Sequence, residues 1–283
     1  MKKACFYHSG CPDGFGAAWA VWNAWGDRAR YTSQSHHERI HARDYAGDLV
    51  AFVDITPRNN ELRELAETAG QLIVLDHHLS SRERYQSDSE LVNSVEEFGH
   101  TVHFDLDHSG AILAWRYFMP DEPIPDLLAC IQDEDLWSWK LPHSREVNAA
   151  LAAYPRRFEI WSELAAKPIA DLVRMGEPIV RAREMEVDRL LAQTHTVSLG
   201  TRRIEAVNAT QNRSAVGHEL SRRQSFGPPW GCVYRVQGGT VHVTLYSIGD
   251  LDVSLVAAEY GGGGHPNASG FSVPLRDWLE HFV

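Results

Sequence analysis

The sequence predicts an α/β protein with a parallel-sheet amino-terminal domain, a helical connector and a smaller α+β carboxy-terminal domain. Two observations give this fold class. In residues 1–80, apolar runs of strand length alternate with helical patterns, as in a parallel sheet built from right-handed crossovers. After about Val197 the pattern changes to short β-branched runs that lead to a glycine-rich segment, which indicates a separate α+β domain.

The amino-terminal domain begins with three strand-like runs, "KACFY", "LVAFVD" and "QLIVLD". A helical pattern with apolar residues from Ala17 to Trp25 lies between the first two runs, and "NNELRELAETA" lies between the second and third. Packing against neighbouring elements explains the tryptophans of the first helix. This alternation of strands and helices predicts a parallel sheet.

The rest of the chain is first helical and then mixed in pattern. The segment from "SGAILAWRYF" to about Leu164 is mostly helical, and a long charged helix is expected to begin near Pro178, because proline suits a first helical turn. The strand-like runs "RRIEAVNA", "GCVYRV" and "TVHVTLYS" follow, then the helix-like "VSLVAAEY" and the glycine-rich "GGGGHPNASGF". We expect a domain at 1–165, a helical linker at 166–196 and a second domain at 197–283.

Charge restricts the class of partner. The chain of 283 residues has a formal net charge of −11 and is 43% hydrophobic, a composition typical of globular proteins. Proteins that follow long nucleic acids gain affinity by neutralising many phosphates, so this charge argues against such a partner. A short anionic substrate remains compatible, since a few cations, helix N-termini or metal ions can create a local positive site.

Cysteine usage and hydropathy indicate the compartment. The four cysteines form no C-x-x-C pair, so reduced thiols are expected. No segment has the pattern of a signal peptide or a membrane span, so we expect a cytoplasmic protein without a membrane partner. The polar stretch "SQSHHERIH" contains His36, His37 and His41, which we expect at a solvated surface.

Polar side chains follow all three predicted strands of the first domain. His8 follows the first strand, Asp54 ends the second, and Asp76 with His77 and His78 ends the third. The carboxyl ends of parallel strands form the edge at which open α/β sheets bind ligands. Each residue taken singly has a simpler role as a helix cap or hydrogen-bonded side chain, but several converging Asp, His and Cys residues suit a site for two divalent ions. The candidates are His8, Cys11, Asp13, Asp54, Asp76, His77, His78 and Asp133.

Five segments resemble the signatures of one family. "VLDHHLS" resembles the Asp-His-His signature of the DHH phosphoesterase family, and "HSGCPDG", "FVDIT" and "IQDEDLW" resemble its first, second and fourth motifs. "GGGGHPNASGF" resembles the glycine-rich signature of the DHH-associated carboxy-terminal domain, and "VNAT" with Ser214 resembles an upstream part of that domain. A three-letter motif alone is weak evidence, whereas five ordered matches over nearly the whole chain are specific.

The resemblance implies two divalent ions, usually manganese, bridged by the carboxylate of Asp54. The implied ligands are His8, Cys11 and Asp54 at one ion, and Asp13, Asp54, His77 and Asp133 at the other. Asp135 follows Asp133 by two residues and is the alternative ligand; Asp133 is preferred because it comes first in the motif.

The resemblance also implies catalytic and substrate-binding roles. Asp54 and Asp76 act at the metals, with Asp76 orienting His77, and His78 contacts the phosphate. A water between two cations loses a proton near neutral pH and attacks phosphorus in line, so no nucleophilic side chain is required. In the second domain, backbone N–H groups of a glycine-rich loop approach a phosphate closely. The implied substrate-binding residues are His78, Asn208, Ser214, Gly262, Gly263, Gly264 and His265.

The function implied is metal-dependent hydrolysis of phosphoester bonds in short nucleotides, with the active site in the cleft between the domains. Candidate substrates are short oligoribonucleotides, linear dinucleotides and adenosine 3′,5′-bisphosphate (pAp), and a homodimer is one option for assembly. A processive single-strand exonuclease of the RecJ type is disfavoured by the acidic charge, and a pyrophosphatase by the type of second domain. The rival from another class is a nucleotide-binding sensor that has lost activity, which Tyr246 suggests because many relatives carry Arg there.

Cys11 is the other departure from the family pattern. Relatives usually carry Asp-x-Asp-Gly, and "CPDG" has Cys11 in the first position. If the thiol is a ligand, it favours zinc, cobalt or iron over manganese. Two alternatives stay open: Cys11 packs as a small buried hydrophobe, or Asp13 is the first carboxylate and Phe15 stands in the second position.

Overall fold

The computed structural model describes residues 1–35 and 38–283 of the chain. His36 and His37, expected at the surface, lie outside the described residues, and His41 is exposed. The chain divides into two compact units, Met1–Val180 and Arg181–Val283.

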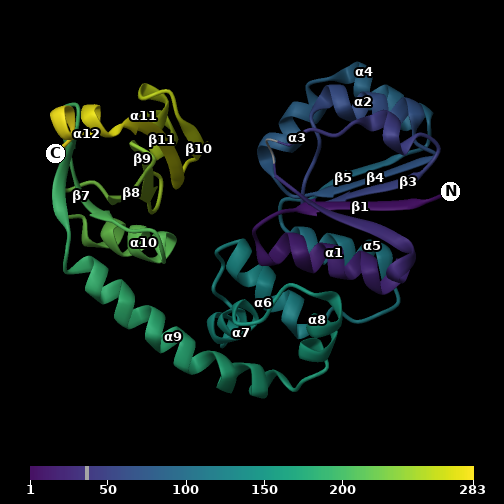
Figure 1. Cartoon of the computed structure of the whole chain (residues 1–283), viewed down its shortest axis with the longest axis horizontal. Helices are drawn as coiled ribbons and strands as arrows, with labels where there is room; N and C mark the ends of the chain where they lie inside the picture. The colour runs from purple at the N-terminus through teal and green to yellow at the C-terminus, as the bar shows by residue number, and fades with distance from the viewer. Residues whose placement is uncertain (36–37) are drawn as a thin grey trace. The chain divides into compact units, whose positions relative to one another are not determined.

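The first unit is built on a parallel sheet of five strands in the order β2-β1-β3-β4-β5 (Figure 1). The central strand β3 is buried along its whole length, because alternate residues face the cores on the two sides of the sheet. The strands are β1 Lys3–His8, β2 Ala29–Gln34, β3 Leu49–Val53, β4 Gln71–Asp76 and β5 Thr101–Phe104.

Helices cover both faces of this sheet. Figure 1 shows α1 and α5 on one face and α2, α3 and α4 on the other. One core joins the first face to α6, α7 and α8, and the other core joins the second face to α2 and α4. The helices are α1 Pro12–Trp25, α2 Asn59–Thr68, α3 Leu79–Gln86, α4 Ser89–Glu97, α5 Gly110–Phe118, α6 Asp126–Asp135, α7 Ser144–Ala152 and α8 Phe158–Ala165, with short 3₁₀ turns η1 Gly26–Arg28 and η2 Ala42–Tyr45.

The second unit has a mixed sheet of six strands in the order β10-β11-β9-β8-β7-β6, in which only β7 and β8 are parallel among the described pairs. One face packs on α10 and the other on α11 and α12. These elements are β6 His195–Leu199, β7 Arg202–Asn208, α10 Arg213–Arg223, β8 Trp230–Gln237, β9 Thr240–Ser247, α11 Val253–Glu259, β10 Gly263–His265, β11 Ala268–Pro274 and α12 Leu275–His281.

The predicted fold class is confirmed, with three local differences. The edge strands β2 and β5 were not expected, because "ARYTSQ" and "TVHF" are short or polar, as edge strands often are. Helix α9 spans Ile169–Leu191, so it begins nine residues before Pro178, which lies inside it. Pro168 immediately precedes this helix. A backbone N–H at that position would have no partner within the helix, so proline costs no hydrogen bond there. The glycine-rich segment forms the hairpin of β10 and β11.

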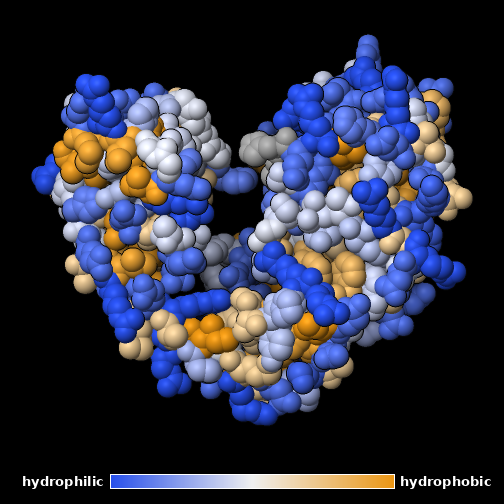
Figure 2. Space-filling model, viewed as in Figure 1, coloured by the Kyte–Doolittle hydropathy of each residue, from blue (hydrophilic) through white to orange (hydrophobic). Residues whose placement is uncertain are grey.

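Hydrophilic residues cover most of the face shown in Figure 2, and apolar residues appear on it in small groups. Among the described residues, no helix combines the length and the apolar composition needed to cross a membrane.

Candidate metal centre

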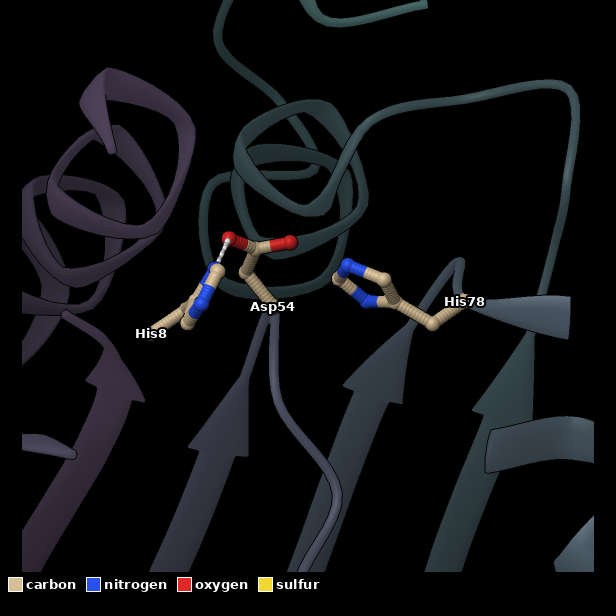
Figure 3. A group of neighbouring side chains, drawn as sticks. All are labelled: His8, Asp54 and His78. Atoms are coloured by element: carbon tan, nitrogen blue, oxygen red, sulfur yellow. Dashed lines mark ion pairs between the residues drawn. The ribbon is translucent and has the colours of Figure 1, made fainter. Parts of the chain in front are cut away.

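Three neighbouring strands deliver the candidate ligands to one edge of the first sheet. His8 ends β1, Asp54 directly follows β3, and Asp76 ends β4 with His77 and His78 after it. Because β1, β3 and β4 are parallel neighbours, their carboxyl ends meet. Figure 3 shows the Asp54 carboxylate between the imidazoles of His8 and His78.

Asp54 has an unusual backbone conformation. Its φ of 60° lies in the left-handed region, which costs an Asp residue on the order of 1–3 kcal/mol. The Asp54 amide donates to the Leu75 carbonyl at 2.9 Å, which fixes the turn after β3. Gly110 begins α5 against this turn, where a Cβ atom would lie 2.4 Å from the Asp54 Cβ. The first turn of α5 therefore approaches Asp54 only because residue 110 is glycine.

The first cluster faces the Oδ2 atom of Asp54. His8 Nδ1 lies 3.4 Å from this oxygen, and Cys11 Sγ lies 3.5 Å from it and 3.3 Å from His8 Nδ1. One donor atom of His78 lies within 4.8 Å of those of His8 and Asp54. These side chains could hold one metal ion.

The second cluster faces the Oδ1 atom of Asp54. His77 Nε2 lies 3.1 Å from this oxygen, 3.8 Å from Asp13 Oδ2 and 3.5 Å from Asp135 Oδ2. Asp13 and Asp54 are each only 1% exposed. Asp13, His77 and Asp135 could hold a second metal ion beside the first.

Asp76 is fully buried behind both clusters and positions the two histidines. Its Oδ1 accepts hydrogen bonds from the backbone N–H groups of His77 and His78 at 2.7 and 3.2 Å, and pairs with His78 Nδ1 at 2.7 Å. Its Oδ2 accepts from the Thr56 hydroxyl at 2.5 Å. Asp76 was expected to orient His77, but the imidazole that its carboxylate contacts is that of His78.

The electrostatics of the clusters favour bound cations. Burial opposes ionisation of Asp54, but the imidazoles of His77 and His8 outweigh it and hold the pKa of Asp54 below its usual value. Burial also lowers the pKa of His77, and the Asp54 carboxylate more than offsets this and raises it to about 9. At Asp13, burial and then the carboxylates of Asp54 and Asp135 raise the pKa well above its usual value. The close carboxylates of Asp13, Asp54 and Asp135 thus repel one another, and a bound cation would relieve this repulsion.

Two carboxylate oxygens without hydrogen-bond donors among the described residues also indicate a place for cations. Asp13 Oδ2 and Asp54 Oδ1 are buried and accept no hydrogen bond in the described part of the chain, although His77 lies at ion-pair distance. Buried carboxylate oxygens are normally satisfied, and metal coordination would satisfy both. The donor set of carboxylates and imidazoles therefore fits divalent metal ions.

The Asp133 carboxylate makes its hydrogen bonds outside both clusters. It accepts from the backbone N–H groups of Lys140 and Leu141 at 2.8 and 3.3 Å and from the Ser144 hydroxyl at 2.6 Å. It therefore holds the segment between α6 and α7. The structure brings Asp135, and not Asp133, to the second cluster.

Apart from His78, the candidate substrate-binding residues lie in the second unit and are mostly exposed. His265 pairs with Ala268, and Ala268 pairs with Tyr246, so the side chains of these residues share the face that packs on α10. Ser214 is in the first turn of α10, with its hydroxyl 3.5 Å from that of Tyr246. Asn208 follows Val207, whose side chain packs on this face, so alternation places Asn208 on the opposite face.

The three glycines expected to bind phosphate have different surroundings. A Cβ atom at Gly262 would lie 2.1 Å from the Gly270 carbonyl oxygen, and one at Gly264 would lie 2.7 Å from that of Ala268. These two glycines are thus required for the close pairing of β10 with β11. A Cβ at Gly263 would meet open space.

Comparison with known proteins bears on both units. Residues 201–283 match the DHHA1 domain model. The chain is 28% identical over 290 residues to an uncharacterized protein of Acanthamoeba polyphaga mimivirus, which covers 94% of this chain and 66% of that protein. It is 21% identical over 244 residues to the oligoribonuclease NrnB of Bacillus subtilis (strain 168), which covers 80% of this chain and 59% of NrnB. The carboxy-terminal part of this chain is a DHHA1 domain.

The chain spans slightly less than two thirds of the length of these two relatives. A solved structure of an exopolyphosphatase-related protein from Bacteroides fragilis shares its fold, with a TM-score of 0.50 and 14% sequence identity over 95% of this chain and 86% of that one. The expected DHH-associated carboxy-terminal domain and the two-part α/β architecture are confirmed.

Two contributors to the metal centre were not singled out in the sequence. Thr56 supports Asp76, and its signal was its place two residues after Asp54 at the same sheet edge. Gly110 allows α5 to approach Asp54, and the preceding Ser109 in "HSGAIL" marks the helix start, as an N-cap residue often does. The contact of Gly110 with Asp54 joins residues far apart in the chain, so no local pattern indicates it.

Proposed function

We propose that this protein is a DHH phosphoesterase, a metal-dependent hydrolase of phosphoester bonds in short nucleotides or oligonucleotides. The observation that carries the proposal is the shared position of Asp54, whose two oxygens face two different ligand clusters. Two-metal hydrolases use such a carboxylate to hold a pair of ions side by side. The relation to an oligoribonuclease supports nucleic-acid fragments as the substrate class.

The proposed ligands are His8, Cys11 and Asp54 at the first ion, and Asp13, Asp54, His77 and Asp135 at the second, with manganese as the physiological metal of the second site. Asp135 takes the place expected for Asp133, because the carboxylate of Asp133 is committed to three hydrogen bonds. When bound, two divalent ions supply an activated water and stabilise charge on the phosphoryl oxygens.

The side chains of the chain itself perform the remaining tasks. A donor atom of His78 lies near those of His8 and Asp54, but we assign His78 to the phosphate beside the first ion. The Asp76 carboxylate pairs with His78 Nδ1, so the other ring nitrogen would make that contact. The same pairing raises the pKa of His78 against the lowering effect of burial, so the imidazole can carry the positive charge that suits a phosphate contact. Asp54 stays ionised because the neighbouring imidazoles lower its pKa.

In the DHHA1 domain, we propose that His265, Ser214 and the backbone N–H of Gly263 bind the nucleotide. His265 and Ser214 are exposed and lie on the α10 face, and Gly263 borders open space. The net charge of −11 limits the length of polyanion that the protein tolerates. We therefore propose di- to decanucleotides and pAp as the substrates.

The test is a hydrolysis panel in manganese, with ribo- and deoxyribonucleotides from two residues to several tens, pAp and cyclic dinucleotides. We expect cleavage of the short strands and a rate that falls as the strand lengthens. Equal rates on a dinucleotide and on a strand of several tens of nucleotides would contradict the length limit. Tight nucleotide binding with no turnover in any metal would support the sensor instead.

A further inference from the structure

We infer that Cys11 is a thiolate ligand of the first metal ion, and that this site prefers zinc, cobalt(II) or iron(II) to manganese. The inference rests on the proposed function and deepens it, because it assigns different metals to the two sites of one centre.

Three donor atoms lie close together in the first cluster. His8 Nδ1, Cys11 Sγ and Asp54 Oδ2 form a triangle with sides of 3.3, 3.5 and 3.4 Å. A tetrahedral zinc ion with bonds of about 2.3 Å to sulfur and about 2.0–2.2 Å to nitrogen and oxygen separates its ligands by about 3.3–3.6 Å. The three atoms are therefore spaced as ligands of one ion.

The sulfur atom of Cys11 lies among polar groups. Cys11 is the N-cap of α1, and its Sγ accepts a hydrogen bond from the Gly14 backbone N–H at 3.2 Å. A helix N-terminus stabilises negative charge, so the Gly14 N–H would stabilise the sulfur once a bound metal ion has displaced its proton. With His8 and Asp54, the sulfur has three polar neighbours within 3.5 Å, which a cysteine packed as a hydrophobe would not have.

The other cysteines provide an internal contrast. Cys5, Cys130 and Cys232 are buried, whereas Cys11 is partly exposed at the sheet edge. Asp54, whose Oδ2 lies 3.5 Å from Cys11 Sγ, is 1% exposed and forms with His8 and His78 a group of donor atoms close enough to hold one metal ion, which independently indicates a place for a cation beside Cys11. Cys11 is thus the one cysteine of the four placed where a metal is expected.

The two clusters differ in donor chemistry. The second has carboxylate and imidazole donors only, which suit manganese, whereas sulfur in the first favours softer ions. Binding at the first site breaks the S–H bond, forms a metal–sulfur bond and releases the proton to solvent. We therefore expect the metal-loaded centre to hold a soft ion at the first site and manganese at the second.

Cobalt(II) titration of the full chain, followed by absorption spectroscopy, tests this inference. The wild type should show visible d–d bands from bound cobalt and a near-ultraviolet sulfur-to-cobalt charge-transfer band. Cys11→Ser and Cys11→Asp should keep the d–d bands and lose the charge-transfer band, and Cys130→Ser is the matched control that keeps both. Cys11→Asp should also lower the ratio of zinc to manganese affinity by at least about tenfold.

A measurement on the wild type makes the test independent of how the variants fold. Because Cys11 is the most exposed of the four cysteines, a disulfide reagent should modify it faster than the three buried thiols in metal-free native protein, and zinc should slow that reaction. Bound cobalt without a charge-transfer band, or a reactive thiol unaffected by zinc, would overturn the role of Cys11 and leave the proposed function standing. Native protein that binds no cobalt at all would contradict both.

Discussion

Asp54 shows how one residue links backbone strain to the metal centre. Its left-handed φ of 60° turns the chain at the end of β3 and presents both carboxylate oxygens beyond the sheet edge. The hydrogen bond to Leu75 and the approach of Gly110 hold this conformation in place. Strain of this kind persists where the surrounding structure determines it, and it is common at functional sites.

The two acidic residues at the end of α6 should differ sharply when replaced. Asp135→Ala should remove the second metal ion and most of the activity, because its carboxylate belongs to that cluster. Asp133→Ala should keep both ions but lower the free energy of unfolding by about 1.5–3 kcal/mol, because hydrogen bonds to a buried charge are lost. Metal analysis and denaturant unfolding check both variants. Loss of one ion in Asp133→Ala with two ions in Asp135→Ala would reverse the assignment.

At the scale of elements, the parallel strands explain why part of the site was predictable. His8, Asp54 and Asp76 each stand where a recognisable apolar strand ends, and parallel neighbours bring those ends together. The choice between Asp133 and Asp135 could not be made in this way. Residues two apart on a helix point about 200° away from each other, and tertiary packing alone decides which of them faces the sheet edge.

Contacts with other elements also explain the strands and the helix start that the sequence did not predict. The edge strands β2 and β5 depend on pairing with β1 and β4, and their own residues have little strand pattern. Pro178 resembles a helix start, yet the nine residues before it are helical, and Leu172 among them packs in the core of the first unit. The local sequence does not indicate such contacts.

The N-cap of α4 gives a pH-dependent prediction. Asp88 accepts a hydrogen bond from the Leu91 backbone N–H at 3.1 Å and pairs with Arg63 at 2.8 Å, and these contacts lower its pKa. Because the folded pKa is depressed, the stabilisation is present above the unfolded pKa of about 3.9 and is lost as the pH falls through the folded value. Asp88→Ala should therefore lower Tm at pH 7 and progressively less in acid.

Thermal scans across pH check this prediction, with the exposed Asp121→Ala as the matched control. The control should change Tm little at any pH. If Asp88→Ala lowered Tm equally at neutral pH and well below the ordinary pKa of a carboxyl group, the cap would not act through its charge.

At the scale of the whole molecule, the acidic chain concentrates buried negative charge at one edge of one unit. Asp13 and Asp54 lie there beside Asp135, and the burial of Asp135 raises its pKa. Divalent ions bind these ionised groups in the folded state and should therefore stabilise the protein. The second unit has its own sheet and cores, and its proposed role is toward substrate.

Manganese should accordingly raise the unfolding temperature. At a concentration 100 times the dissociation constant, one site contributes about 2.7 kcal/mol. His265→Ala should respond to manganese as the wild type does, with reduced turnover, because His265 belongs to the other unit. Calorimetry with and without a chelator measures the shift. Loss of the shift in a folded His265→Ala would mean that this residue acts on the metal.

Metal content and hydrolysis of the best short substrate, measured on the same preparations of wild type and Asp54→Asn, test the central claim most directly. The substitution keeps the shape of the side chain but removes the charge that the two clusters share. The wild type should hold two ions per chain and cleave the substrate, and Asp54→Asn should hold fewer ions and lose at least about 100-fold in kcat. An Asp54→Asn protein with two bound ions and most of its activity would contradict a centre built around Asp54.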